Sequence, residues 1–351
     1  MKYLNILLVF APVAIIGSFL GWSPTLLFFA SALAVIPGAG ILGQATEEIA
    51  VRTGPRLGGL INATLGNAAE LMITLFAIQA GLLDLVKASI TGSILGNVLL
   101  VLGFSILFGG IKNGIQHFDR RHAGLNATQL MMAVLALVIP SLFFFASKEV
   151  AGPVEWLSLG TATTMLLIYG LGLFFSLRVL RAGEPGIERE IQAEHQGGWT
   201  MRRSLITLLL ATGLIAWLSE ILVGTVEHTV ATLGVSEFFI GIIVVPLVGN
   251  VAEHAVAVQT ALKNKMELSL AVSLGSSLQI ALFVAPLLVF ISLALGNPLT
   301  LVFNQFEIIA LFGAALIGGM VANDGESNWM EGAQLLAVYL ILAMAFLFLG
   351  R

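Results

Sequence analysis

The sequence contains no cysteine and very few charged residues. None of its 351 residues is Cys, and only 10% are Asp, Glu, Lys or Arg. Without cysteine the chain cannot provide a disulfide, a thiolate nucleophile or a Cys-based zinc site. Soluble domains carry about 25% charged residues, so this shortage indicates that lipid surrounds much of the chain.

The groups that an intramembrane hydrolase needs are also scarce. The three aspartates, Asp84, Asp119 and Asp324, all fall in predicted loops, and none of the five histidines belongs to an H-E-x-x-H pair. The sequence therefore supports neither an aspartate dyad nor a metal-dependent hydrolase. With a net charge of −4 and no basic stripe, it also gives no indication of a nucleic-acid partner.

Long apolar runs dominate what remains. Hydrophobic residues make up 58% of the chain, and its mean hydropathy is +1.00. Runs of 18 or more apolar residues can cross a hydrocarbon core, and since open sheet edges are unstable in lipid, we expect helices. The prediction is an all-α membrane protein with eleven spans, near residues 3–21, 25–50, 57–81, 86–110, 127–147, 154–181, 203–231, 237–262, 268–294, 302–322 and 329–350.

The positions of the basic residues predict an orientation, because Lys and Arg gather in cytoplasmic loops. Of the 16 Lys and Arg residues, 13 lie at the N-terminus or in the even-numbered loops between predicted spans. The remaining three are Lys87, Lys148 and Arg351. We therefore expect a cytoplasmic N-terminus and a C-terminus on the opposite side of the membrane.

A short motif occurs twice. Residues 66–71 read GNAAEL and residues 249–254 read GNVAEH. A Gly-Ser pair follows each box glutamate at the same spacing, as Gly92-Ser93 and as Gly275-Ser276, so that one offset of 183 residues relates both elements. A shared spacing of this kind indicates an internal repeat, which is common in transporters.

The repeat predicts the domain organisation. Each copy covers five predicted spans, and an odd number makes the second copy enter the membrane from the opposite side. Such inverted repeats place a substrate site near the membrane midplane. We expect an extra N-terminal helix at 1–24, a first repeat at 25–182, a cytoplasmic acidic helix at 183–202 and a second repeat at 203–351.

The boxes supply the chemistry of a cation site. A carboxylate inside a membrane helix costs at least ~2.5 kcal/mol, so Glu70 and Glu253, at matching positions, are candidates for function. Asn67 and Asn250 each lie three residues earlier, on the same helix face. Carboxylate and amide oxygens are ligands that Ca²⁺ prefers, and two glutamates neutralise its charge.

Further oxygens lie close by in the sequence. Gly66 and Gly249 open the boxes, and Pro246 precedes the second, so we expect kinks or breaks that free backbone carbonyls. Ser93 and Ser276 of the neighbouring spans offer hydroxyls. Because protons and a cation compete for the same carboxylates, the site predicts exchange, provided that the empty charged site does not reorient.

These features resemble the Ca²⁺/H⁺ exchangers of the cation/Ca²⁺ antiporter superfamily, in a prokaryotic form. The resemblance covers about residues 25–350 and implies a 1+5+5 helix arrangement with Glu70 and Glu253 as alternating carriers of Ca²⁺ and H⁺. The resemblance implies that the chain needs no cofactor beyond the transported ions. It also implies that the chain lies in a bacterial plasma membrane. Family members often carry proline before the box glutamate, where this chain has Ala69 and Ala252.

Several weaker candidates and alternatives stay open. A Na⁺/Ca²⁺ exchanger needs additional oxygen sites for Na⁺, and a Mn²⁺/H⁺ antiporter uses the same ligand types. The sequence does not determine whether the chain forms a homo-oligomer. Candidate pathway residues are Gln279, Asn97, Glu47, Glu220, Glu227 and His254, with Glu307 a further intramembrane carboxylate, and candidate regulatory residues are Glu184, Glu188, Glu190 and Glu194.

Overall fold

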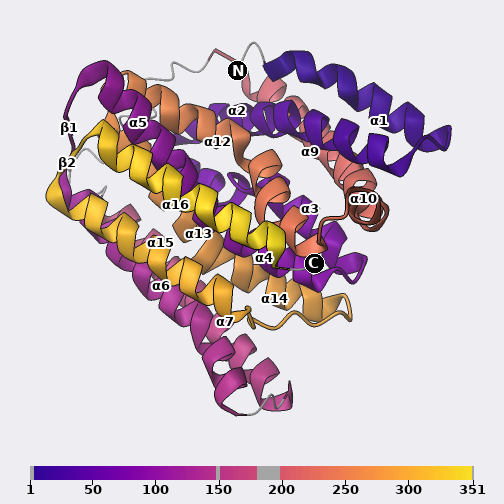
Figure 1. Cartoon of the computed structure of the whole chain (residues 1–351). Coiled ribbons are helices and arrows are strands. Elements are labelled where there is room, and N and C mark those ends of the chain that lie inside the picture. Colours follow the sequence, from indigo (N-terminus) through magenta and orange to yellow (C-terminus); the bar gives the residue numbers. More distant parts are fainter. Residues whose placement is uncertain (1–3, 148–150, 180–197, 350–351) are drawn as a thin grey trace. The chain divides into compact units, whose positions relative to one another are not determined.

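The computed structural model describes residues 4–147, 151–179 and 198–349 (Figure 1). In this part of the chain the regular structure is helical except for two short strands, β1 (Gln116–His117) and β2 (Glu326–Ser327). The helices are η1 (Leu4–Val9), α1 (Phe10–Phe19), α2 (Pro24–Leu65), α3 (Ala68–Gln79), α4 (Leu83–Leu95), η2 (Gly96–Val101), α5 (Leu102–Asn113), α6 (Arg120–Ala146), α7 (Ala151–Val179), α9 (Met201–Gly224), α10 (Val226–Leu233), α11 (Glu237–Phe239), η4 (Ile240–Val244), α12 (Val245–Leu262), α13 (Met266–Gln279), η5 (Ile280–Val284), α14 (Ala285–Ala294), α15 (Gln305–Asp324) and α16 (Trp329–Phe348).

Nine helices in the described residues are long and apolar enough to cross a membrane. Several combine two or three elements, as in the span Leu83–Asn113, which joins α4, η2 and α5. The prediction of an all-α membrane protein is therefore confirmed. Two of the eleven predicted spans, 3–21 and 57–81, correspond to the shorter apolar helices Leu4–Phe19 and Ala68–Gln79, so the count of eleven stays a prediction.

The predicted span 57–81 is wrong as a continuous helix. Turn residues at Gly66 and Asn67 separate α2 from α3, and α2 itself contains a kink at Gly54. Gly54 has a φ of 83°, which lies in the left-handed region that only glycine adopts at little cost. The break at Gly66 and Asn67 thus divides the predicted span 57–81, whereas the kink at Gly54 falls in the predicted loop between the spans 25–50 and 57–81.

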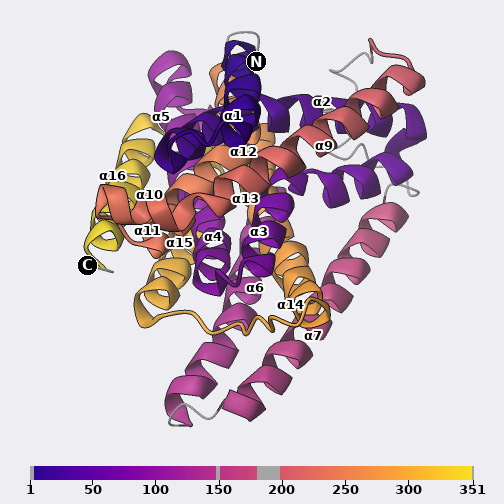
Figure 2. The ribbon, with the colours of Figure 1, turned by 90° about the vertical axis from the view of Figure 1, so that its right-hand side faces the viewer.

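The first compact unit consists of Met1–Phe76, Ile168–Gly234 and Val248–Ala252. Within it α2 and α9 lie side by side, and α1 packs on α2 (Figures 1 and 2). Small residues permit the close approach of α2 and α9, as is usual for membrane helices. The buried contacts are made by Ala39, Leu42, Ala69, Ala211 and Ile215.

The second compact unit consists of Ala77–Leu167, Val235–Leu247 and Glu253–Arg351. Here α4 packs against η4, α16 against α5, and α15 against α6. The strands β1 and β2 pair antiparallel, with Gln116 opposite Ser327 and His117 opposite Glu326. The α4–η4 contact brings backbones together, because a Cβ on Gly92 would lie 2.0 Å from the Ile242 carbonyl oxygen.

Three of the spans contain a π-helical segment, at η2, η4 and η5. Two of them follow the repeated Gly-Ser pairs: η2 begins at Gly96 and η5 at Ile280, an offset of 184 residues against 183 for the motif. Segments of π-helix are rare and concentrate at functional sites. The repeat is therefore visible in local backbone geometry as well as in sequence.

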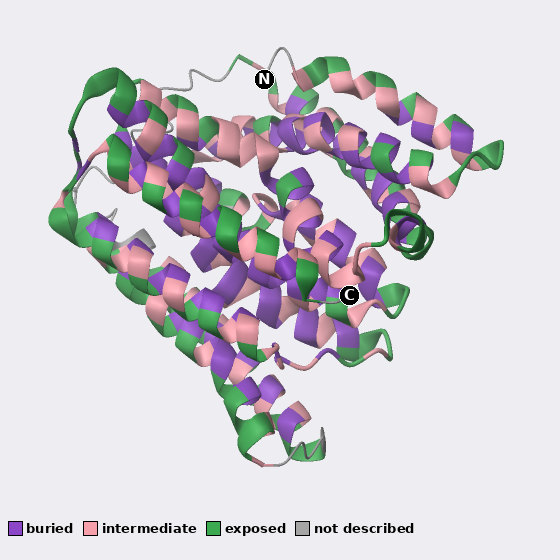
Figure 3. Cartoon of the chain, in the orientation of Figure 1, coloured by how far each residue is buried: buried purple, intermediate pink, exposed green. Residues whose placement is uncertain are grey.

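The outer surface carries large apolar side chains, as expected for contact with lipid. Buried residues make up 72% of the most apolar window of the span Leu83–Asn113 but only 17% of that in Gly152–Phe175 and in Trp329–Phe348. Exposed side chains on these outer helices include Leu167, Leu171, Leu340 and Ile341 (Figure 3). A soluble protein rarely exposes such continuous apolar surface.

The Gly92 contact gives a prediction for folding stability. The variant Gly92→Ala should lower the free energy of unfolding by about 2–3 kcal/mol, because its methyl group would displace the η4 backbone. The matched control is Gly96→Ala in the same span, where a Cβ meets no atom within 4 Å. Melting in detergent measures both, and equal melting temperatures for the two variants would contradict the packing described.

Candidate functional site

Glu70 is a buried carboxylate with a partner from the second box. It lies in the first turn of α3 and is 1% exposed. Asn250 Nδ2 donates a hydrogen bond to Glu70 Oε2 at 3.4 Å. A Cβ on Gly249 would lie 3.6 Å from Glu70 Cβ, so this part of α12 passes close to Glu70. The first compact unit thus contains the carboxylate of one box and the amide of the other.

The break at the first box explains why Glu70 tolerates burial. Gly66 and Asn67 end one helix and precede the next, which places Glu70 at the beginning of α3. The first turn of a helix has N–H groups without helical partners and the positive end of the helix dipole. Asn67 is 3% exposed and has an interaction partner of its own. The break that the sequence predicts at Gly66 is confirmed.

The corresponding break at the second box is absent. The helix α12 runs without interruption from Val245 to Leu262 and includes Gly249. The departure from α geometry occurs earlier, in the π-helical segment η4, and Pro246 follows at the start of α12. Pro246 thus lies inside the continuous span Glu237–Leu262, directly after the π-helical turns, where it removes one N–H donor from the helix. The prediction of a break at Gly249 was therefore wrong.

Glu253 is held in the second compact unit. The Ser276 hydroxyl of α13 forms a hydrogen bond with its carboxyl group. The other oxygen, Oε2, is buried and has no partner among the described residues. An unpaired buried carboxylate oxygen is costly, so a cation, a proton or a water molecule must satisfy it. The repeat-related glutamates thus differ in their partners, an amide for Glu70 and a hydroxyl for Glu253.

Other polar candidates are buried in the spans that carry the Gly-Ser pairs. Ser93 and Asn97 are each 1% exposed, and Ser276 is 6% exposed. Ser93 has an interaction partner, whereas Asn97 Nδ2 has none among the described residues. Gln279 is half-buried, has a partner and ends α13 directly before η5. Hydroxyl and amide side chains therefore lie in or next to the π-helical segments η2 and η5.

The predicted pathway carboxylates are more peripheral. Glu47 is half-buried and paired, and Glu220 and Glu227 are exposed. Thr225 separates α9 from α10 inside the predicted span 203–231, so Glu220 and Glu227 lie in different helices. His254 is half-buried beside Glu253 on α12. The acidic residues Glu184, Glu188, Glu190 and Glu194 lie outside the described residues.

Glu307 is the buried carboxylate whose surroundings the sequence did not reveal. It is 3% exposed, its Oε2 accepts from Asn304 N at 2.9 Å, and its Oε1 accepts from Thr91 Oγ1 at 2.8 Å. Asn304 Oδ1 in turn accepts from Glu307 N at 2.8 Å, which completes a capping box. The N-x-x-E spacing before an apolar run was the available signal, and it indicates a helix start. Glu307 therefore has a structural role, in tying α15 to α4.

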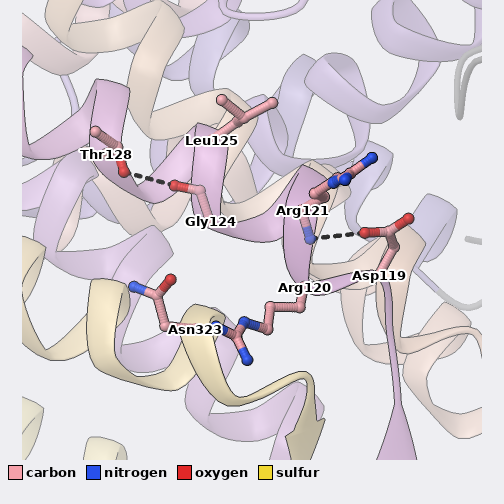
Figure 4. A pocket seen from close by; sticks show the side chains of 7 residues that line it. All are labelled: Asp119, Arg120, Arg121, Gly124, Leu125, Thr128 and Asn323. Carbon is pink, nitrogen blue, oxygen red and sulfur yellow. Dashed lines mark hydrogen bonds between the residues drawn. The ribbon is translucent and has the colours of Figure 1, made fainter.

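A surface pocket lies apart from these polar residues along the chain, at the start of α6. In Figure 4 the Arg120 side chain extends toward Asn323 of α15, and Asp119 accepts from Arg121 N at 2.6 Å. The pocket is lined by Asp119, Arg120, Arg121, Gly124, Leu125, Thr128 and Asn323. Backbone N–H groups of Arg121 and His122 lower the pKa of Asp119, which caps the helix. The interactions of Asp119 are therefore those of a residue that caps the start of a helix.

Comparison with known proteins identifies the family. The model of the sodium/calcium exchanger protein family matches residues 23–178 and 203–348, two stretches close to the predicted repeats. A Ca²⁺/H⁺ antiporter of Aphanothece halophytica is 41% identical over 97% of this chain and 95% of its own length. The Ca²⁺/H⁺ antiporter ChaA of Bacillus subtilis is 42% identical over 96% of each chain.

A solved structure agrees with these relatives. Native YfkE superimposes with a TM-score of 0.86 at 39% identity and covers 98% of this chain and 99% of its own. The family match covers both halves of the chain, and each half contains one of the two glutamate boxes. The chain belongs to the sodium/calcium exchanger protein family.

Proposed function

We propose that this chain is a secondary active antiporter that exports Ca²⁺ from the cytoplasm in exchange for H⁺. The observation that carries the proposal is the near full-length identity of 41–42% to relatives named Ca²⁺/H⁺ antiporter. The buried Glu70 and the half-buried Glu253, whose Oε2 atom is buried, supply the groups that such an exchange needs. No enzymatic step is required, because transport uses only the gradients of the two ions.

The cation ligands follow from the repeat. Glu70 and Glu253 supply two carboxylates, and Asn67 and Asn250 supply amide oxygens. The backbone carbonyl at Gly66, where the helix breaks, and the hydroxyls of Ser93 and Ser276 complete a set of hard oxygen ligands, as Ca²⁺ prefers. Asn250 Nδ2 donates to Glu70 Oε2, so the amide of the second box lies beside the carboxylate of the first. This ligand set also fits Mn²⁺, so selectivity depends on cage dimensions.

Coupling arises from competition for the same oxygens. A dication bound by two glutamates excludes protons from them, and protonated glutamates no longer attract the dication. If only the occupied forms change their accessible side, cation and proton movements become linked. Glu253 Oε2 has no hydrogen-bond partner among the described residues. A proton or a cation can therefore bind this oxygen without breaking a protein hydrogen bond.

The distribution of Lys and Arg supports an orientation in the membrane, and the prokaryotic relatives support a location. The positive-inside distribution of Lys and Arg places the N-terminus in the cytoplasm. The prokaryotic relatives favour a bacterial plasma membrane for this chain. In this orientation the acidic residues between 184 and 194 face the cytoplasm, where they can capture Ca²⁺ or regulate transport. A homo-oligomer within the bilayer is compatible with the same arrangement.

The central test is Ca²⁺ uptake into proteoliposomes under an imposed pH gradient. The wild-type protein should drive uptake without Na⁺, and Glu70→Gln and Glu253→Gln should each reduce it by more than 100-fold, since each removes a charge that the dication requires. The control is Glu326→Gln in the surface strand β2, which should transport normally.

The outcomes separate the alternatives. Uptake that requires Na⁺ would identify a Na⁺/Ca²⁺ exchanger, and a strong preference for Mn²⁺ in competition would identify a Mn²⁺/H⁺ antiporter. Uptake that persists in both glutamine variants would show that the proposed site is wrong.

A second test concerns Asn250. The variant Asn250→Ala removes the donor to Glu70 and a proposed cation ligand, and groups that position ligands typically contribute 10–100-fold in metal affinity. We expect the Ca²⁺ concentration for half-maximal uptake to rise by about that factor. Asn323→Ala, in the surface pocket at α6, is the matched control. An unchanged Ca²⁺ dependence of Asn250→Ala would remove Asn250 from the site.

A further inference from the structure

Buried polar atoms without partners concentrate in one part of the second compact unit. Of the ten such side-chain atoms among the described residues, seven lie on α5, α12, α13 and the elements next to them, at Asn97 Nδ2, Ser105 Oγ, Gln116 Oε1, Glu253 Oε2, Ser269 Oγ, Ser273 Oγ and Ser327 Oγ, and the other three are Thr25 Oγ1, Ser219 Oγ and Glu331 Oε2. Native proteins leave few such atoms unpaired, and bound water usually satisfies those that remain. Seven in neighbouring elements require a common explanation.

The unpartnered atoms on α13 form a line that leads to Glu253. Ser269, Ser273 and Ser276 are spaced by four and three residues, which places them along one face of the helix. Ser269 and Ser273 are at most 1% exposed. Ser276, at the inner end, hydrogen-bonds with Glu253. The other end of the line is the first turn of α13, next to the exposed residues Lys263 and Lys265.

A second line lies on α5, against which α13 packs. Ser105 and Gly109 are four residues apart and share a face. A Cβ on Gly109 would lie 2.1 Å from Gln116 Oε1 and 3.2 Å from Ala261 Cβ, so this face points toward the end of α12. On α12 itself, Ala257 and Ala261 follow Glu253 at intervals of four residues. Small residues therefore follow one another on α12 and α5 between Glu253 and Gln116.

Gln116 marks the outer end of this space. Its Nε2 donates to Ala261 O at 2.9 Å and to Asn264 Oδ1 at 3.0 Å, which fixes the amide, while its Oε1 has no partner. Ser327 stands opposite Gln116 in the β1–β2 ribbon and also has an unpartnered hydroxyl. Residues beside Gln116, including His117, are exposed to solvent.

We propose that the seam between α5, α12 and α13 holds a file of ordered water molecules that connects Glu253 with the surface at the β1–β2 ribbon. Each water finds hydroxyl or amide partners along the seam, and the small side chain of Ala257, one turn after Glu253, leaves room that a larger side chain would fill. The ribbon lies among the basic loops, on the predicted cytoplasmic side. The file gives solvent access to Glu253, a role in exchange that rests on the proposed function.

The first repeat does not contain the same line. The positions of α4 that correspond to Ser269 and Ser273, at the offset of 183, are Val86 and Ile90, both fully buried. Water has no hydrogen-bonding partner at such side chains. The polar seam is therefore specific to the second repeat, and symmetry of the two boxes does not account for it.

Cysteine accessibility tests the seam directly, because the chain has no native cysteine. Ser105→Cys and Ser273→Cys should react with a small water-soluble methanethiosulfonate reagent at least tenfold faster than Ile106→Cys and Leu274→Cys. A thiol reacts only as a thiolate, which forms where water reaches it. All four positions are at most 1% exposed, and Leu274 packs toward Gly318 of α15 instead. Intact mass of the purified protein reports the modification.

The second measurement uses a larger side chain, Ala257→Leu, to fill the seam. Adding Ala257→Leu to Ser273→Cys should slow its labelling at least tenfold, whereas adding Ala257→Leu to an exposed Lys263→Cys should not change labelling of that thiol. Size-exclusion profiles show that each variant is folded.

Equal labelling of serine-derived and apolar-derived cysteines would overturn the water file, even if Ca²⁺ transport is normal. Fast labelling in a protein without H⁺-coupled transport would support the seam and reject the proposed function.

Discussion

A carboxylate in hydrocarbon needs partners from the protein, and the rest of this structure depends on that requirement. Glu70 meets it with the first turn of α3 and with the amide of Asn250 at 3.4 Å. Glu253 meets it only in part, through Ser276, and keeps a buried oxygen without a partner. Glu307, by contrast, is fully engaged by Thr91 and Asn304. The proposed carrier Glu253 thus keeps an oxygen open to a ligand, whereas Glu307 uses both oxygens to join helices.

Close backbone packing fixes the surroundings of these carboxylates. Gly92 brings α4 against the carbonyl of Ile242, and Gly249 lets α12 pass beside Glu70. In a membrane such contacts replace the hydrophobic driving force, because lipid is as apolar as the helix surfaces. The π-helical segments η2 and η5 follow the Gly-Ser pairs in both repeats. Tight glycine contacts and local changes of helix geometry therefore occur next to the candidate ligands.

The two repeats have diverged around a shared plan. The first box lies at a break between α2 and α3, whereas the second lies inside the continuous helix α12. Hydroxyls line α13 where α4 carries Val86 and Ile90. A transporter exposes its site to the two sides of the membrane in turn. Different residues along the routes to Glu70 and Glu253 allow ions to reach the site differently from each side. Sequence symmetry marks the proposed carriers Glu70 and Glu253, and the departures from it distinguish their surroundings.

The sequence by itself determined the membrane class, most of the spans and the repeated glutamates, because apolar length and motif spacing are local properties. It also indicated the break at Gly66. It did not determine that α12 continues through Gly249 or that Thr225 separates α9 from α10 inside the predicted span 203–231. Only the tertiary structure decided that Asn250 pairs with Glu70 and that Glu253 keeps an unpartnered oxygen. Those features depend on contacts between residues up to 180 positions apart, which no local pattern encodes.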